Sequence, residues 1–193
     1  MPKYVIEHLD GKIGKWSLIE YTNISRMIGK SNLWFTNIKK KNKNLEKIGK
    51  VFKERFSEIQ IKEKINPKEV CVLDPESNKL LTTRESKKFK YYVFGGILGD
   101  YPPRKRTKKE LSNFIKSEKR NIGKKQFSTD NAVFVTSQIV NGKDFKKMKF
   151  IYKPTIKMNE FLSLDLPFLY PEENGKPKMS PELMKFLKRK KGF

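Results

Sequence analysis

Residues 90–100, KYYVFGGILGD, constrain the fold most, because they indicate a buried strand that runs directly into a glycine-rich loop. The YYVF part is aromatic or β-branched, which suits a pleated, half-buried surface. Gly95, Gly96 and Gly99 then leave the backbone almost bare, so that a ligand can approach it closely. Pro102–Pro103 prevent a helix from starting at once. The G-G-x-x-G spacing is neither a dinucleotide fingerprint nor a Walker loop. The glycine-rich segment can therefore be interpreted either as a tight turn or as a ligand-binding loop.

The segments before this strand alternate between the hydrophobic pattern of a strand and that of a helix. Strand patterns cover Tyr4–His8, Asn32–Thr36 and Glu69–Leu73, and helical spacing covers Lys15–Gly29 and Leu45–Phe56. This alternation predicts a single α/β domain over residues 1–193, with a mainly parallel sheet flanked by helices. Ligands bind such sheets at the carboxyl ends of the strands. The glycine loop lies at such an end, which favours a ligand site over a turn.

The second half of the chain predicts three more helices and one strand. These are a helix over Thr107–Ser117 with a T-x-x-E capping box, a helix from about Asp130 to Val140, a strand at Met148–Tyr152, and a terminal helix at Ser180–Lys191 within the basic segment 180–193. Lys157–Tyr170 is predicted to be an irregular, unusually apolar loop.

Charge is the strongest signal of the composition. The 44 Lys and Arg residues outnumber the 21 Asp and Glu residues and give a net charge of +23. Such a surface attracts phosphate backbones. The alternative is a lysine-rich, thermophile-like composition with ion-pair networks, but those need matching acids. Contact with a polyanion is the favoured interpretation.

Several other classes are disfavoured by the composition. The single cysteine, Cys71, permits no internal disulfide, and with the single histidine, His8, it argues against a metal site or a Ser-His-Asp triad. No apolar run has the length of a membrane span, and the N-terminus lacks the apolar core of a signal peptide. We therefore expect a cytoplasmic protein that binds no metal and no membrane. Cys71 is expected in the core, and His8 is expected to be structural or exposed rather than catalytic.

Three segments together resemble the SPOUT class of S-adenosylmethionine (SAM)-dependent methyltransferases. They are VFGGILGDYPPR (93–104), IGKKQFSTDNAVFVT (122–136) and IKMNEFLSLDLPFLY (156–170). The N-terminal YVIEHLDGKIGKWSLIEY and CVLDPE (71–76) extend the match to a small archaeal and eukaryotic family. That family is described as predicted RNA methyltransferases, with a branch that methylates an arginine of a ribosomal protein. The resemblance implies a C-terminal trefoil knot whose three loops hold SAM.

The resemblance also implies the site residues. The implied SAM-binding residues are Gly95, Gly96, Leu98, Gly99, Gly123, Gln126, Phe127, Ser128, Asn159, Leu164, Leu166 and Pro167. Asp100 is the first candidate to orient or deprotonate the acceptor, and Glu160 is the second. Simpler roles stay open: Asp100 as a loop cap, Ser128 as a helix cap, and Leu164 and Leu166 as core residues.

The acceptor is expected to be tRNA or ribosomal RNA, because the charge favours RNA. The candidate RNA-binding residues are Arg104, Arg106, Lys108, Lys109, Lys124 and Lys125. One alternative is arginine methylation of a ribosomal protein. Phe161 argues against it, because the eukaryotic branch carries a histidine there. A second alternative is an RNA-binding module without catalysis. We expect a monomer, with dimerisation through the knot as the alternative.

Overall fold

The computed structural model describes residues 1–97 and 106–189. Four of the predicted site residues lie outside the described residues: Leu98, Gly99, Asp100 and Arg104. Within the described part of the chain, no helix combines the length and the apolar character needed to cross a bilayer.

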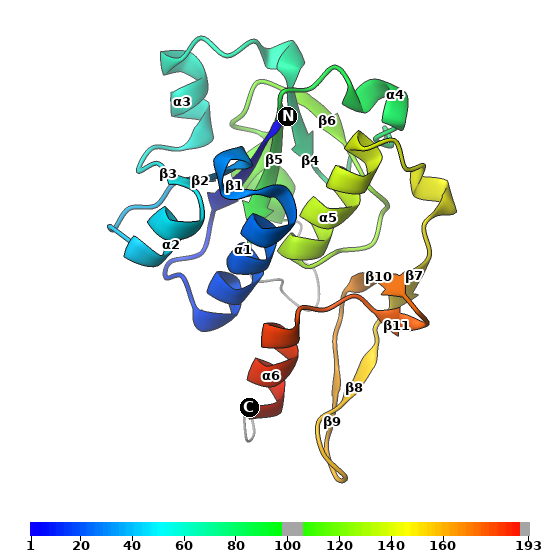
Figure 1. Ribbon diagram of the computed structural model, residues 1–193. Coiled ribbons are helices and arrows are strands. Elements are labelled where there is room, and N and C mark those ends of the chain that lie inside the picture. Colours follow the sequence, from blue (N-terminus) through cyan, green and yellow to red (C-terminus); the bar gives the residue numbers. More distant parts are fainter. Residues whose placement is uncertain (98–105, 190–193) are drawn as a thin grey trace.

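A six-stranded parallel sheet forms the centre of the molecule (Figure 1). Its strands, in spatial order, are β3 (Lys50–Val51), β2 (Leu33–Thr36), β1 (Lys3–His8), β5 (Tyr91–Gly96), β4 (Val70–Leu73) and β6 (Glu118–Arg120). Every neighbouring pair is parallel. The predicted α/β architecture is therefore confirmed, and the strand of the glycine-rich segment lies inside the sheet rather than at an edge.

Helices cover both faces of this sheet. One apolar cluster joins Tyr4, Ile6 and Phe94 to α1 (Lys15–Ile28) and α5 (Thr129–Val140). The other face of the same strands presents the alternate side chains, since successive residues of a strand point to opposite sides. These residues, among them Val5 and Val93, pack against α3 (Phe56–Lys62) and against the turn that ends at Ile115. The short helices α2 (Lys43–Ile48) and α4 (Thr83–Ser86) lie at the margins.

The C-terminal part forms a separate antiparallel unit beside the sheet. Strands β7 (Phe150–Tyr152), β10 (Leu169–Glu173) and β11 (Lys176–Pro177) make one small sheet, β8 (Thr155–Lys157) and β9 (Ser163–Asp165) make a hairpin, and α6 (Pro181–Arg189) follows. In Figure 1 the hairpin projects from the body beside α6. As predicted, Ser180 caps α6: its hydroxyl accepts a hydrogen bond from the Leu183 amide at 3.1 Å.

Three predicted elements were wrong. Leu45–Phe56 is not one helix, because α2 ends at Ile48. The backbone of the next residue, Gly49, lies so close to Phe35 that a Cβ would meet its ring at 2.7 Å. Lys157–Tyr170 is not irregular, because it holds part of a hairpin and the start of β10. The Thr107 capping box does not form: residues 107–112 are a π-helical turn, and Glu110 pairs with Arg106 instead.

Candidate functional site

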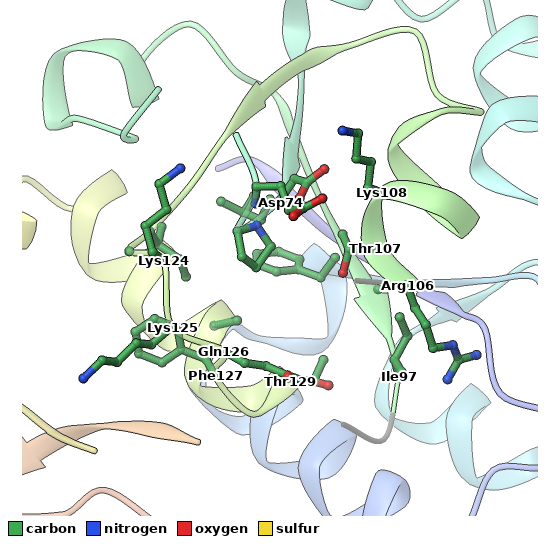
Figure 2. Close-up of a pocket in the computed structure, with 18 residues that line it drawn as sticks. Asp74, Ile97, Arg106, Thr107, Lys108, Lys124, Lys125, Gln126, Phe127 and Thr129 are labelled. Carbon is green, nitrogen blue, oxygen red and sulfur yellow. Dashed lines mark hydrogen bonds between the residues drawn. The ribbon is translucent and has the colours of Figure 1, made fainter. Parts of the chain in front are cut away.

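A cavity of about 440 Å³ opens at the carboxyl ends of β4 and β5 (Figure 2). Its lining consists of residues 73–76, 94, 95, 97, 106–108, 122–127, 129 and 132. These come from the ends of two strands, the chain between β6 and α5, the first turns of α5, and the π-helical turn. This is the edge at which parallel α/β sheets bind ligands, and the volume suits one small molecule.

One wall of the cavity is apolar. Leu73 at the end of β4 and Phe94 near the end of β5 lie on the α5 side of the sheet, and Ile122 and Phe127 approach from the segment before α5. Gly123 lies in this segment with φ +102°, a conformation that disfavours side chains, and a Cβ there would come within 3.1 Å of Phe145. The wall can therefore hold a flat ring, while the backbone at Gly123 stays uncovered.

Two carboxylates face the cavity from the end of β4. Asp74 is only 3% exposed. Its Oδ1 accepts a hydrogen bond from the Glu76 amide at 2.9 Å, and its Oδ2 accepts one from the Ser112 hydroxyl at 2.6 Å. Glu76 lines the cavity beside it and is half-buried. A carboxylate held on two sides keeps further lone pairs for a ligand, so this corner can bind a cationic group.

Lysines surround the mouth of the cavity. Lys108 and Lys124 lie on opposite sides of Asp74 in Figure 2. The Lys124 ammonium donates to the Ser77 carbonyl at 2.6 Å, and the Lys125 ammonium lies 3.8 Å from the centre of the Tyr152 ring. Of the predicted RNA-binding residues, Lys108, Lys124 and Lys125 are thus brought to this rim.

Arg106 lines the cavity, but its charge is balanced by carboxylates. Its Nη1 lies 2.8 Å from Asp10 Oδ1, and its Nε and Nη2 contact the two oxygens of Glu110 at 2.7 and 3.0 Å. Glu110, followed by Asp10, raises the pKa of the Arg106 guanidinium. In Figure 2 the guanidinium points away from Asp74. The structure therefore does not support Arg106 as a phosphate clamp. Lys109 also lies outside the cavity lining, beside Leu9 at a shallower depression.

Four of the implied SAM-binding residues line the cavity: Gly95, Gly123, Gln126 and Phe127. Gly96 and Ser128 lie next to it but have other contacts. A Cβ on Gly96 would meet the Tyr21 hydroxyl at 2.5 Å, so this glycine is required for packing on α1. The Ser128 hydroxyl donates to Asp130 at 2.7 Å and is buried.

Five predicted residues are not brought to the cavity lining. Asn159 and Glu160 form the exposed tip between β8 and β9. Leu164 and Leu166 belong to the apolar cluster at the base of that hairpin, as the core interpretation expected. Pro167 is half-buried in the connection to β10.

Asp74 and Glu76 are not among the site residues predicted from the sequence, although the strand that precedes them is visible there. The rule that pointed to the glycine loop applies equally to the strand Glu69–Leu73, which runs into D-P-E. Cys71 and His8 have the expected structural environments: both are buried, and His8 Nδ1 lies 3.0 Å from the Tyr21 hydroxyl. Burial lowers the pKa of His8.

The chemical character of the cavity lining suits SAM. The adenine needs an apolar wall, which Leu73, Phe94 and Ile122 provide. The sulfonium and the amino group are cationic, and Glu76 offers negative charge to them.

Comparison with known proteins gives one consistent result. The family described as "Protein arginine N-methyltransferase SFM1-like" matches residues 3–192. The protein arginine N-methyltransferase SFM1 of Saccharomyces cerevisiae is 32% identical, over 97% of this chain and 94% of the yeast protein. Two crystal structures of the yeast enzyme superpose with a TM-score of 0.88. The complex with S-adenosylhomocysteine (SAH) is 31% identical over 96% of this chain and 94% of its own, and the complex with SAM is 32% identical over 97% and 90%.

Proposed function

We propose that this chain, which belongs to the SFM1-like family of protein arginine N-methyltransferases, methylates an arginine side chain of a protein. The chain is a SAM-dependent methyltransferase of SPOUT fold. The observation that carries the proposal is the family match, which spans residues 3–192. The expectation of an RNA acceptor came from net charge, and the comparisons support its alternative better.

The site offers what an arginine acceptor needs. A guanidinium is held best by carboxylates, which can pair with two of its N–H groups at once. Among the described residues, Asp74 and Glu76 are the carboxylates of the cavity lining, and Asp74 is fixed by the Ser112 hydroxyl and the Glu76 amide. Phosphate groups beside an RNA acceptor would instead be repelled by these carboxylates. The three rim lysines remain available to contact acidic or phosphate groups farther from the acceptor.

The roles of the residues follow from their positions. When bound, SAM supplies an electrophilic methyl group, and the apolar wall with Gly95, Gly123 and Gln126 would hold it. Asp74 orients the guanidinium so that one nitrogen faces the methyl group. That nitrogen loses a proton as the new bond forms, and a carboxylate within hydrogen-bond reach can accept it.

Replacing Asp74 with Asn tests these roles. The amide still accepts from the Glu76 amide and can donate to Ser112, so the fold should be retained. We expect kcat/KM for arginine methylation to fall by about 10²-fold, with a much smaller change in SAM affinity measured by calorimetry. Products are identified as methylarginine by mass spectrometry of the acceptor peptides.

Asp144→Asn is the matched control. Asp144 caps the turn at Phe145–Lys147 outside the cavity lining, and Asn caps as well as Asp. It should leave both activity and affinity unchanged. Full activity of Asp74→Asn would exclude this residue from the acceptor site, and the absence of methylarginine with the unaltered enzyme would contradict the proposed function itself.

We also propose that the C-terminal part is threaded as a trefoil knot. The SPOUT resemblance and the family membership support this threading. A knot survives denaturation and shortens the stretched chain. Single-molecule stretching from both termini should therefore give a contour length below that of an unknotted chain of 193 residues; a full-length extension would contradict the knot.

A further inference from the structure

The hairpin of β8 and β9 ends in a fixed tip. The Asn159 side-chain oxygen accepts hydrogen bonds from the amides of Phe161 and Leu162 at 2.9 and 2.8 Å. The Met158 amide donates to the Leu162 carbonyl at 2.8 Å, which closes the turn. The tip, residues 159–162, is thus held in one conformation by its own hydrogen bonds.

This tip presents apolar side chains to solvent. Ile156 and Leu164 point inward and pack in the cluster that also contains Met184 of α6. Phe161, in contrast, is 96% exposed and Leu162 is 45% exposed. Phe161 and Leu162 thus form a small exposed apolar patch on a projecting turn, and interaction sites use patches of this kind.

The charge of this region differs from that of the rest of the chain. No Lys or Arg occurs from Met158 to Gly175, although the whole chain carries 44 of them. The same stretch contains Glu160, Asp165, Glu172 and Glu173. A protein of net charge +23 repels a basic partner over most of its surface, and this stretch lacks the repulsive groups. It also lacks the cations that bind RNA phosphates.

The hairpin is attached directly to the wall of the cavity. The Leu169 amide, at the start of β10, donates to the Gln126 carbonyl at 2.8 Å, and Phe127 forms a β-bridge with Leu169. Only residues 166–168 separate this anchor from β9. The cavity has the volume for one small ligand, so contacts that select a whole acceptor protein must lie outside it.

We propose that the hairpin tip docks the acceptor protein, by inserting Phe161 and Leu162 into an apolar depression on a basic protein surface. The proposal rests on the proposed function, since it assumes a protein acceptor. Glu160 lies in the same tip and faces solvent. It complements a basic partner, which the rest of the enzyme surface would repel.

Phe161→Ser tests the docking role, because it removes the exposed ring and leaves the Asn159 hydrogen bonds to the backbone intact. The probes are the ribosomal protein fraction, and a peptide of about ten residues centred on an arginine methylated in that fraction. We expect kcat/KM for the intact protein to fall at least about tenfold. The peptide should be methylated at the unaltered rate, and SAM affinity should not change. Glu160→Lys should weaken methylation of the intact protein in the same selective way.

Ile61→Ser is the matched control, because Ile61 is 77% exposed on α3 and lies outside the hairpin. It should change none of the rates. Equal rates for Phe161→Ser and the unaltered enzyme on the intact protein would overturn the docking role while leaving arginine methylation established. An equal loss on protein and peptide would also overturn it, as would a loss of tRNA binding with protein methylation unchanged. If the unaltered enzyme methylates no arginine in either probe, the proposed function fails first.

Discussion

A buried pair of carboxylates lies where α1 meets α5. Glu20 of α1 and Asp130 of α5 are 5% and 2% exposed. The Trp16 indole donates to Glu20 at 2.8 Å, and the Asn23 amide donates to Asp130 at 2.8 Å. Burial, and then the charge of Asp130, raise the pKa of Glu20 to about 8. Glu20 is therefore protonated at neutral pH, which avoids two adjacent buried charges.

This pair predicts that stability falls as the pH rises. The pKa of Glu20 is about 8 in the fold against an ordinary value of 4.5. The stabilisation of the fold by protonated Glu20 is complete below pH 4.5 and is lost as the pH rises through 8. Gln resembles the protonated acid, so Glu20→Gln should lose this dependence. At pH 9 its free energy of unfolding in urea should exceed that of the unaltered protein by at least ~1 kcal/mol.

The control for this prediction is Glu46→Gln, at an exposed position of α2. It should keep the decline of stability between pH 5 and pH 9. The account of the buried pair is contradicted if Glu20→Gln destabilises the protein equally at both pH values.

At the scale of elements, β5 ends in two glycines with different roles. Gly95 lines the cavity, while Gly96 pairs with His8 and lies against α1. A Cβ on Gly96 would meet the Tyr21 hydroxyl at 2.5 Å and Ile6 at 2.9 Å. The close packing of α1 on the sheet therefore requires glycine at this position.

Gly96→Ala should lower the free energy of unfolding by ~1–3 kcal/mol, the usual cost of overpacking. SAM affinity of the folded fraction should change little. Gly11→Ala is the control, since a Cβ there has no atom within 4 Å. A Gly96→Ala protein with normal stability but no SAM binding would contradict the packing role and show that Gly96 belongs to the cofactor site.

The elements that sequence analysis predicted well are those with a strong hydrophobic period. The buried strands β1, β2, β4 and β5 and the helices α1 and α5 all have one. The strand β6 has the sequence E-K-R, and only Arg120 of it is buried, paired with Glu85 and Glu118. Such a strand is set by tertiary ion pairs and gives no local signal. The resemblance implies that Asn159 belongs to the cofactor site, whereas the structure places it at the hairpin tip. A sequence motif does not say how far its residues lie from the cavity in the folded chain.

At the scale of the molecule, the proposed function draws on two regions of opposite character. The broad positive charge, with the rim lysines, favours an acceptor that is found near RNA. The stretch from Met158 to Gly175, which includes the hairpin tip, has no Lys or Arg and suits the proposed basic protein partner. We propose a ribosomal protein as the acceptor, because it would combine these two environments and so reconcile the charge of the chain with an arginine acceptor. The edge of the sheet that carries the candidate site was predictable, because ligands bind at the carboxyl ends of parallel strands. Which strand ends supply the residues was not, because this rule applies to all the strands alike.

The most direct test of this account is the transfer of labelled methyl from SAM into ribosomes and tRNA from cells that lack the protein. The products are divided and digested with nuclease or with protease. We predict that protease releases the label and that the labelled residue is methylarginine. Label released by nuclease alone would contradict the account and restore RNA as the acceptor.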